Sequence, residues 1–306
     1  MNIAYLILCH TDPCFVNHTI ETLSYEKDSF FIHVDKRVEI TDFKRLIQRE
    51  NVCFLEKRYS SYWGGFNAIK AIMELIRLAN NSGDYDRFVL LQGQDYPLVS
   101  NAEIHSFFEE KRQIEFCKGR NISTSAKKAD YIKCACFWMQ DVDGVLGKAI
   151  SGVLSRINNI GLKYRSKYYK GKPIYHGWAQ FALTKRCVNF LLKTYDNEKS
   201  YNNYMKHRFP PDELYIPTLI HNSQFRNNVD DTIIKNRDGA ETKLNLTYFE
   251  YPDQVILFRK KDDYEWLRKT GCLFVRKLNS SSAELINEID KNIRKSKKAS
   301  ENNLHV

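Results

Sequence analysis

The residues of this sequence best suited to acid–base chemistry are two acids that follow two prolines, at Pro210-Pro211-Asp212-Glu213. An apolar run over 214–220 follows and predicts a short helix, with Pro217 early enough in it to be tolerated. A carboxylate held near an acceptor hydroxyl can remove its proton as a general base. Acids at a helix N-terminus also favour the helix dipole, so the residues alone leave both catalysis and capping open for Glu213.

A second candidate is the basic pair Arg276-Lys277, with three further cations upstream at 259–261. A departing diphosphate needs its developing charge neutralised, and Arg and Lys can do this without a metal. The same residues could equally form an ordinary basic surface. The Asp-x-Asp pattern at 141–143 lies in a polar loop away from any predicted strand end, so we expect no metal site there.

Polar side chains also gather where the early strands are predicted to end: His10, Asp35, Trp63 and Asp95. An Asp at the tip of a parallel strand can accept hydrogen bonds from a ribose or a base. His10 could instead be a structural histidine, and Asp95 could cap a backbone turn. The sequence has neither a G-x-G-x-x-G motif nor a Walker loop, so it predicts neither a dinucleotide site nor a P-loop.

These side chains need a sheet to position them, and the first part of the chain predicts one. Short apolar runs predict strands over 3–8, 29–34, 52–55 and 88–91. Helical patterns alternate with the strands. They start at Asp12-Pro13, over 66–79, and at Ser100-x-x-Glu103, which forms a capping box. The alternation predicts an α/β fold with a mostly parallel, doubly wound sheet flanked by helices.

The second part of the chain is less regular. Strands are expected over 113–117 and within 244–258, and residues 175–192 read as a strand followed by a helix. No interdomain linker is visible, so we expect one domain over 1–280. A C-terminal helix and a charged tail that frays follow over 281–306.

Composition sets wider limits on what the chain can be. It has 306 residues, of which 43% are hydrophobic, which allows a sizeable core and argues against global disorder. Its net charge of +10 favours anionic partners: nucleotides, phosphates, nucleic acid or an acidic membrane. Eight cysteines without a C-x-x-C pair fit a reduced, intracellular setting. The apolar stretch 3–9 is too short for a membrane anchor, and we expect a strand there rather than a signal peptide.

A basic segment at 163–172 contains five Lys or Arg residues with three tyrosines among them. A solvated loop would explain this composition. The alternative is a contact for an anionic acceptor or for a membrane surface.

Six stretches in order resemble the Core-2/I-branching family of glycosyltransferases, which also includes the peptide xylosyltransferases. The resemblance runs from near residue 3 to about 280. The stretches are Ala4–His10, His33–Arg37, Trp63–Gly65, Gly93–Leu98, Pro211–Glu213 with Thr218 beyond it, and Leu273–Lys277.

The resemblance implies a GT-A-like fold and an inverting transfer of a sugar from a UDP-sugar to a hydroxyl. It also implies catalysis without a metal or other cofactor, with basic side chains at the diphosphate. By position, Glu213 is then the general base. The expected donor-binding residues are Cys9, His10, Asp35, Tyr62, Trp63, Asp95, Arg276 and Lys277. The expected acceptor contacts are Glu115, Trp178 and Tyr248.

The sequence departs from the family pattern in two places. Where the family often has Gly-Ser-x-Trp or Gly-Ser-x-Tyr, this chain has Gly177-Trp178-Ala179-Gln180, so acceptor or donor contacts there differ. A second phosphate-binding Arg has no clear match, because Arg259 is nearby but out of register. The membrane anchor and disulfide pattern of the animal enzymes are also missing, so the resemblance is to a bacterial-type member.

The expected function is therefore transfer of N-acetylglucosamine or xylose to a glycan or lipid-linked glycan, in surface polysaccharide synthesis. We expect a cytoplasmic protein that contacts an acidic inner membrane face peripherally. The alternative is a non-catalytic binder of nucleic acid or of an anionic surface. The chain carries no recognised nucleic-acid motif, so no nucleic-acid partner is expected.

Overall fold

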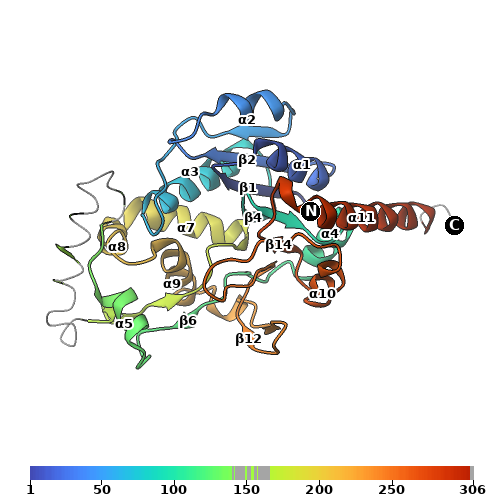
Figure 1. The fold of residues 1–306 in the computed structure, drawn as a ribbon. Helices are drawn as coiled ribbons and strands as arrows, with labels where there is room; N and C mark the ends of the chain where they lie inside the picture. The colour runs from blue at the N-terminus through green and yellow to red at the C-terminus, as the bar shows by residue number, and fades with distance from the viewer. Residues whose placement is uncertain (140, 142–148, 150–152, 155–156, 158–165, 304–306) are drawn as a thin grey trace.

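The computed structural model describes residues 1–139, 141, 149, 153–154, 157 and 166–303 (Figure 1). A five-stranded sheet lies at its centre, in the order β10-β4-β1-β2-β3. The strands are β1 (Ile3–Cys9), β2 (Ser29–Val34), β3 (Val52–Phe54), β4 (Arg87–Gln92) and β10 (Ala182–Thr184). The first four are parallel and β10 pairs antiparallel with β4. The predicted α/β fold with a mostly parallel sheet is confirmed.

The sheet is buried on both faces, which explains why its strands read as continuous apolar runs. In β1, Ile3, Tyr5 and Ile7 belong to one core cluster, while Ala4 and Leu6 belong to the other. Because successive side chains of a strand point to opposite faces, one strand contributes to both cores.

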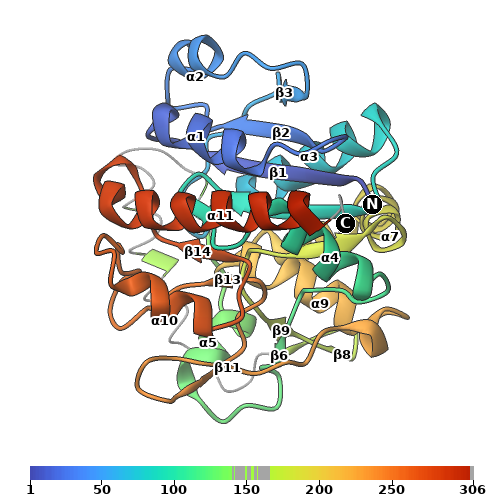
Figure 2. The ribbon, with the colours of Figure 1, turned by 90° about the vertical axis from the view of Figure 1, so that its right-hand side faces the viewer.

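Helices cover the two faces as the doubly wound arrangement requires. One face carries α1 (Pro13–Leu23), α4 (Asn101–Glu110) and α11 (Ala283–Asn303), with α2 (Thr41–Leu46) beside α1. The other face carries α3 (Asn67–Ser82), α7 (Lys185–Asn197) and α9 (Tyr215–His221). Figure 2 shows α11 lying along its face of the molecule. Leu285, Ile286 and Ile289 of α11 are buried, so the start of this helix belongs to the main core.

Two predicted helix starts are confirmed in detail. The Asp12 carboxylate accepts a hydrogen bond from the Phe15 amide, and Pro13 occupies the first turn of α1. Ser100 and Glu103 form the reciprocal capping box of α4. Side-chain acceptors of this kind satisfy amides that a helix leaves unpaired, so local sequence fixes these boundaries.

A smaller sheet extends the main one beyond the end of β4. It consists of β5 (Asp95–Pro97), β14 (Phe274–Arg276) and β13 (Thr247–Tyr248), with α10 (Asp263–Lys269) nearby in the sequence. β5 pairs antiparallel with β14, which sets Arg276 opposite Asp95. This pairing brings the C-terminal basic pair to the edge where β4 ends.

Several short elements complete the fold (Figure 1). They are β6 (Arg120–Asn121), α5 (Lys128–Ala135), β7 (Tyr168–Tyr169), β8 (Lys172–Pro173), β9 (Tyr175–His176), α8 (Lys199–Met205), the 3₁₀ turns Pro211–Glu213, Arg226–Asn228 and Ser280–Ser282, β11 (Ile234–Lys235) and β12 (Glu241–Thr242). Among the described residues, no helix is both long enough and apolar enough to cross a membrane.

Two strand predictions were wrong. Residues 113–117 form only isolated bridges, Glu115 with Val229 and Phe116 with Ala182. Within 244–258 only β13 is a strand, and the chain then turns back through a hydrogen bond from the Ile256 amide to the Glu250 carbonyl. The apolar side chains that suggested strands, such as Phe116 and Leu246, are buried in the core, and burial does not require a ladder partner.

The sheet order defines where a ligand should bind. β1 and β4 are neighbours at the centre of the sheet. β2 and β3 lie beyond β1 on one side, and β10 lies beyond β4 on the other, so the strand order reverses between β1 and β4. Ligands of such sheets bind at the carboxyl ends of the strands beside this reversal. β1 ends at Cys9 and is followed there by His10, and β4 ends at Gln92 and is followed by Gly93.

Candidate active site

Asp35, just after β2, is held by a cation at the carboxyl edge of the sheet. Arg37 donates from Nε to Oδ1 and from Nη2 to Oδ2, both at 2.9 Å, and the Ser61 amide donates to Oδ2 at 3.0 Å. Burial alone would raise the pKa of Asp35, but these hydrogen bonds lower it. The carboxylate is therefore ionised and held in a fixed orientation. A substrate that binds to Asp35 would also meet the Arg37 side chain.

His10 lies where the charges of this edge converge. Its pKa is lowered, first by removal from water, while Asp35 raises it and Arg276, Arg37 and Lys277 lower it further. Cys9 beside it is buried, and its thiol donates to the His33 carbonyl at 3.7 Å. A Cβ on Gly93 would lie 2.6 Å from the Cys9 Cβ, so only glycine allows β4 to end this close to β1. His10, rather than Cys9, is the accessible group here.

The Asp95–Arg276 pair anchors the basic residues at the end of β4. Arg276 Nη1 donates to Asp95 Oδ1 at 2.9 Å, and the Gln92 amide donates to Oδ2 at 2.9 Å. Asp95 is fully buried, and burial raises its pKa while Arg276 opposes the rise. Asp95 was expected among the donor-binding residues, but it is buried and positions Arg276. Lys277 follows with its side chain partly exposed.

Tyr62 and Trp63 link the carboxyl edge of the sheet to the segment 209–213, which contains the acids Asp212 and Glu213. The Arg37 guanidinium lies 4.4 Å above the Tyr62 ring centre. Trp63 is 77% exposed, and its ring meets Phe209 edge-on at 4.7 Å. Because Phe209 immediately precedes Pro210, Trp63 joins the two halves of the site and leaves an aromatic face open to a ligand.

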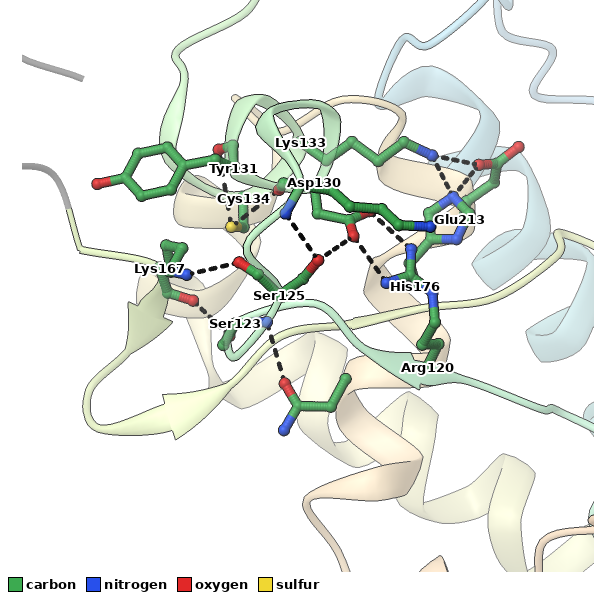
Figure 3. Close-up of polar contacts among 12 residues, drawn as sticks. Arg120, Ser123, Ser125, Asp130, Tyr131, Lys133, Cys134, Lys167, His176 and Glu213 are labelled. Atoms are coloured by element: carbon green, nitrogen blue, oxygen red, sulfur yellow. Dashed lines mark hydrogen bonds and ion pairs between the residues drawn. The ribbon is translucent and has the colours of Figure 1, made fainter. Parts of the chain in front are cut away.

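Glu213 ends the 3₁₀ turn Pro211–Glu213 and is engaged through one oxygen (Figure 3). Its Oε2 lies 2.6 Å from His176 Nε2 and 3.6 Å from Lys133 Nζ. Lys133 Nζ also contacts His176 Nε2. His176 comes from β9 and Lys133 from α5, so the contact depends on elements distant in the sequence. Glu213 is 22% exposed, which leaves it reachable by an acceptor.

A pocket of about 400 Å³ lies beside these residues. Its lining includes His176, Trp178, Arg120, Ile233 and Lys243. The Trp178 ring is held edge-on against Phe249 at 4.7 Å. An aromatic side chain and polar groups around a pocket next to a carboxylate suit a sugar-containing acceptor.

Asp212, the neighbour of Glu213, is in a different environment. Its Oδ1 is buried without a hydrogen-bond partner among the described residues. Burial, and then the charge of Glu213, raise the pKa of Asp212 to about 7. The two adjacent acids are thus separated in function: Glu213 is hydrogen-bonded and reachable, whereas Asp212 is largely protonated below neutral pH.

We expect Asp212→Asn to change how stability depends on pH. The folded pKa of Asp212 lies above its unfolded value, so its protonated form stabilises the fold below pH 4, and this contribution is lost as pH rises through 7. Between pH 4 and 8 the wild type should lose, relative to the variant, on the order of 4 kcal/mol of unfolding free energy. Urea unfolding at several pH values measures this, and parallel curves for the two proteins would contradict it.

The first part of the chain also matches a known family. The family model of the Core-2/I-branching enzyme matches residues 3–137. Over these residues the chain is similar to the Core-2/I-branching enzymes. The match includes the residues from Cys9 to Asp95 that we predicted to bind the donor, and it ends before Glu213 and Arg276.

Individual relatives align with different lengths of this chain. Xylosyltransferase 1 of Rattus norvegicus is 28% identical over 140 residues, 42% of this chain and 17% of that protein. A Homo sapiens protein named as a probable beta-1,3-galactosyl-O-glycosyl-glycoprotein beta-1,6-N-acetylglucosaminyltransferase 7 is 22% identical over 300 residues, 93% of this chain and 66% of that protein. The chain thus covers about a sixth of the length of the rat protein and just under two thirds of the human one. The longer match includes the region of Glu213 and Arg276.

A solved structure of Staphylococcus aureus TarS, residues 1–349, is similar with a TM-score of 0.29 and 11% identity. The similarity covers 67% of this chain and 55% of that chain.

Two of the expected acceptor contacts lie elsewhere. Glu115 is buried and accepts hydrogen bonds from the amide and the hydroxyl of Thr184 at 2.8 and 2.5 Å. Thr184 pairs with Arg87 at the start of β4, so Glu115 is at the opposite edge of the sheet. Tyr248 is buried in the core, and its hydroxyl donates to Glu250 at 2.9 Å. Both predictions were wrong because long-range pairing decided which way these side chains face. Trp178 does lie beside the site.

Two expectations fall partly outside the described residues. In the Asp-x-Asp pattern Val142 and Asp143 are not described, while Asp141 accepts a hydrogen bond from the Asn67 amide at 2.9 Å. In the basic segment, residues 163–165 lie outside the described part. Lys167 and Lys170, which are described, donate to the Ser125 carbonyl and the Ser200 hydroxyl.

Sequence reasoning missed four residues of the site: Arg37, Lys133, His176 and Gln180. Arg37 lies in a stretch that resembles the family, but its pairing with Asp35 two residues earlier was not foreseen. Gln180 hydrogen-bonds Asp95 and is in the same departure from the family pattern as Trp178. No local signal marks Lys133 or His176, because their roles arise only when α5 and β9 meet the 3₁₀ turn.

Proposed function

We propose that the chain is an inverting glycosyltransferase that moves a sugar from a UDP-sugar to a hydroxyl of a glycan acceptor without a metal. The observation that carries the proposal is the arrangement at the carboxyl edge of the sheet. Asp35, His10, Arg276 and Lys277 converge there within a Core-2/I-branching segment and its continuation. A reachable carboxylate, Glu213, lies across Trp63 and Phe209 from them.

In the proposed reaction the acceptor hydroxyl attacks the anomeric carbon directly as UDP leaves from the opposite face. The acceptor O–H bond breaks and its proton passes to Glu213. The bond from the sugar to the diphosphate breaks, and Arg276 and Lys277 stabilise the charge that develops on UDP. One displacement inverts the anomeric carbon, and Asp35 with Arg37 positions the uridine part of the donor.

The choice of donor rests on the relatives. The rat protein is named for xylose transfer and the human protein for N-acetylglucosamine transfer, so these two sugars are the first candidates. We further propose a glycan or lipid-linked glycan acceptor in the pocket beside Trp178, in surface polysaccharide synthesis. The net charge of +10 supports a cytoplasmic protein in peripheral contact with an acidic membrane face. Flotation with anionic liposomes tests that contact, and absence of binding would remove it.

The test of the function is UDP release from UDP-N-acetylglucosamine, UDP-xylose, UDP-glucose and UDP-galactose, each with and without EDTA. We expect one donor to be consumed, with no effect of EDTA and with an inverted product by NMR. Sensitivity to EDTA would assign the diphosphate to a metal instead of Arg276 and Lys277. Neither turnover nor UDP binding, together with steeply salt-dependent binding of nucleic acid, would overturn the proposal.

A further inference from the structure

The two carboxylate oxygens of Glu213 have unequal surroundings. Oε2 contacts His176 Nε2 and Lys133 Nζ, at 2.6 and 3.6 Å. Among the residues drawn in Figure 3, the other oxygen, Oε1, makes no contact. A carboxylate has lone pairs on both oxygens, so one oxygen can be held while the other takes a proton.

The contacts restrict which atom carries hydrogen. A Lys ammonium has only donors, and a ring nitrogen either donates or accepts. If Nε2 carries a hydrogen, it donates to Oε2, and Lys133 directs its own protons to the same oxygen. Were Nε2 to accept from Lys133 instead, Glu213 would need a proton on Oε2 to make its contact. The first arrangement leaves two donors facing each other in the Lys133–His176 contact, but it gives the ionised Oε2 of Glu213 two donors, so we assign the hydrogen to Nε2.

The charges around His176 fit this assignment. The residue opposite it on β6 is Arg120, which forms a two-pronged ion pair with Asp130 of α5 at 2.6 and 2.7 Å. Asp212 adjoins Glu213 on the 3₁₀ turn. Arg120 lowers the pKa of Asp130 to about 2, chiefly by its hydrogen bond, so this pair stays ionised and compensates itself. Glu213 is then the ionised partner left for His176 and Lys133.

Resting on the proposed function, we propose that His176 and Lys133 are positioning residues for Glu213. They hold Oε2, so that Oε1 faces the acceptor and takes its proton. His176 is 14% exposed and lines the pocket beside Trp178, which places the contact next to the acceptor. Burial lowers the pKa of Lys133, and the negative charge of Glu213 opposes this shift, as expected for two side chains that interact directly.

Kinetics of His176→Ala, His176→Gln and Lys133→Met test the role. We expect His176→Ala to lower kcat by about 10²-fold, with the KM for the UDP-sugar changed by less than about twofold. His176→Gln keeps an N–H donor and should recover part of kcat, and Lys133→Met should show the smaller loss. An unchanged kcat in His176→Ala would overturn the inference.

A readout that needs no turnover separates this inference from the proposed function. In the ¹⁵N spectrum of the histidine rings, Nε2 of His176 should carry a strongly hydrogen-bonded proton, and its signal should shift towards that of a weaker hydrogen bond in Glu213→Gln, where a neutral amide oxygen replaces the carboxylate. His105→Gln is the matched control, because it breaks a 2.8 Å contact with Asp28 just before β2, away from the site. Identical Nε2 signals in wild type and Glu213→Gln would overturn the inference. The expected signals in a protein that transfers no sugar would overturn only the proposed function.

Discussion

Glu213→Gln is expected to lower kcat by about 10³-fold or more while UDP affinity stays within about twofold of the wild type. Gln keeps the size of the side chain and an oxygen that can accept from His176, but it cannot take the acceptor proton. The proposed UDP contacts are at Asp35 and Arg276, on other elements of the fold, so they should survive. Initial rates with the active donor, together with UDP titration by calorimetry, measure the two quantities.

Two variants control this experiment. Glu110→Gln removes an acid at the exposed end of α4, and its activity should equal that of the wild type. Asp212→Asn removes the adjacent acid without removing the group placed as the base, and it should retain far more activity than Glu213→Gln. Near-normal turnover of Glu213→Gln, with correct folding shown by circular dichroism, would refute Glu213 as the base. A loss confined to Asp212→Asn would move that role to Asp212.

The sheet and its first helices were predictable because their signals are local. Asp12 with Pro13 and Ser100 with Glu103 cap helices through bonds within one turn, so sequence spacing alone locates them. The strands β1, β2 and β4 are buried on both faces and therefore read as apolar runs whatever their neighbours are. Their carboxyl ends then lie at one edge by topology, which is why His10 and Asp35 meet as expected.

The rest of the site depends on contacts that no local pattern encodes. Asp95 was expected in the crevice, but its partner Arg276 is 181 residues away and turns it into a buried anchor. Glu115 was expected near the acceptor, but Thr184 draws it to the other edge. His176 and Glu213 are 37 residues apart and meet only because β9 passes the 3₁₀ turn. The charged residues can be read from a sequence, but their long-range contacts cannot. These contacts determine whether a charged side chain is available to a ligand or stabilises the fold.

Arg276→Met and Lys277→Met should separate catalysis from stability within one basic pair. Both variants should lower kcat/KM by about 10²-fold, because each removes charge from the departing diphosphate. Only Arg276→Met should also lower the unfolding free energy, by roughly 3 kcal/mol, because it leaves the buried Asp95 carboxylate without its cation. Lys277 has no carboxylate partner among the described residues, so its loss should leave stability unchanged.

The double variant Asp95→Asn with Arg276→Met completes the comparison, since it removes the charge that Arg276→Met leaves unpaired. We expect its stability to return towards the wild type while its activity stays low. Protonation of Asp95 should have the same effect: burial already raises its pKa, so the stability deficit of Arg276→Met should shrink as pH falls. Chemical unfolding at pH 5 and pH 8 tests this. Recovery of activity in the double variant would show that Arg276 acts only through the fold, leaving Lys277 as the cation at the diphosphate.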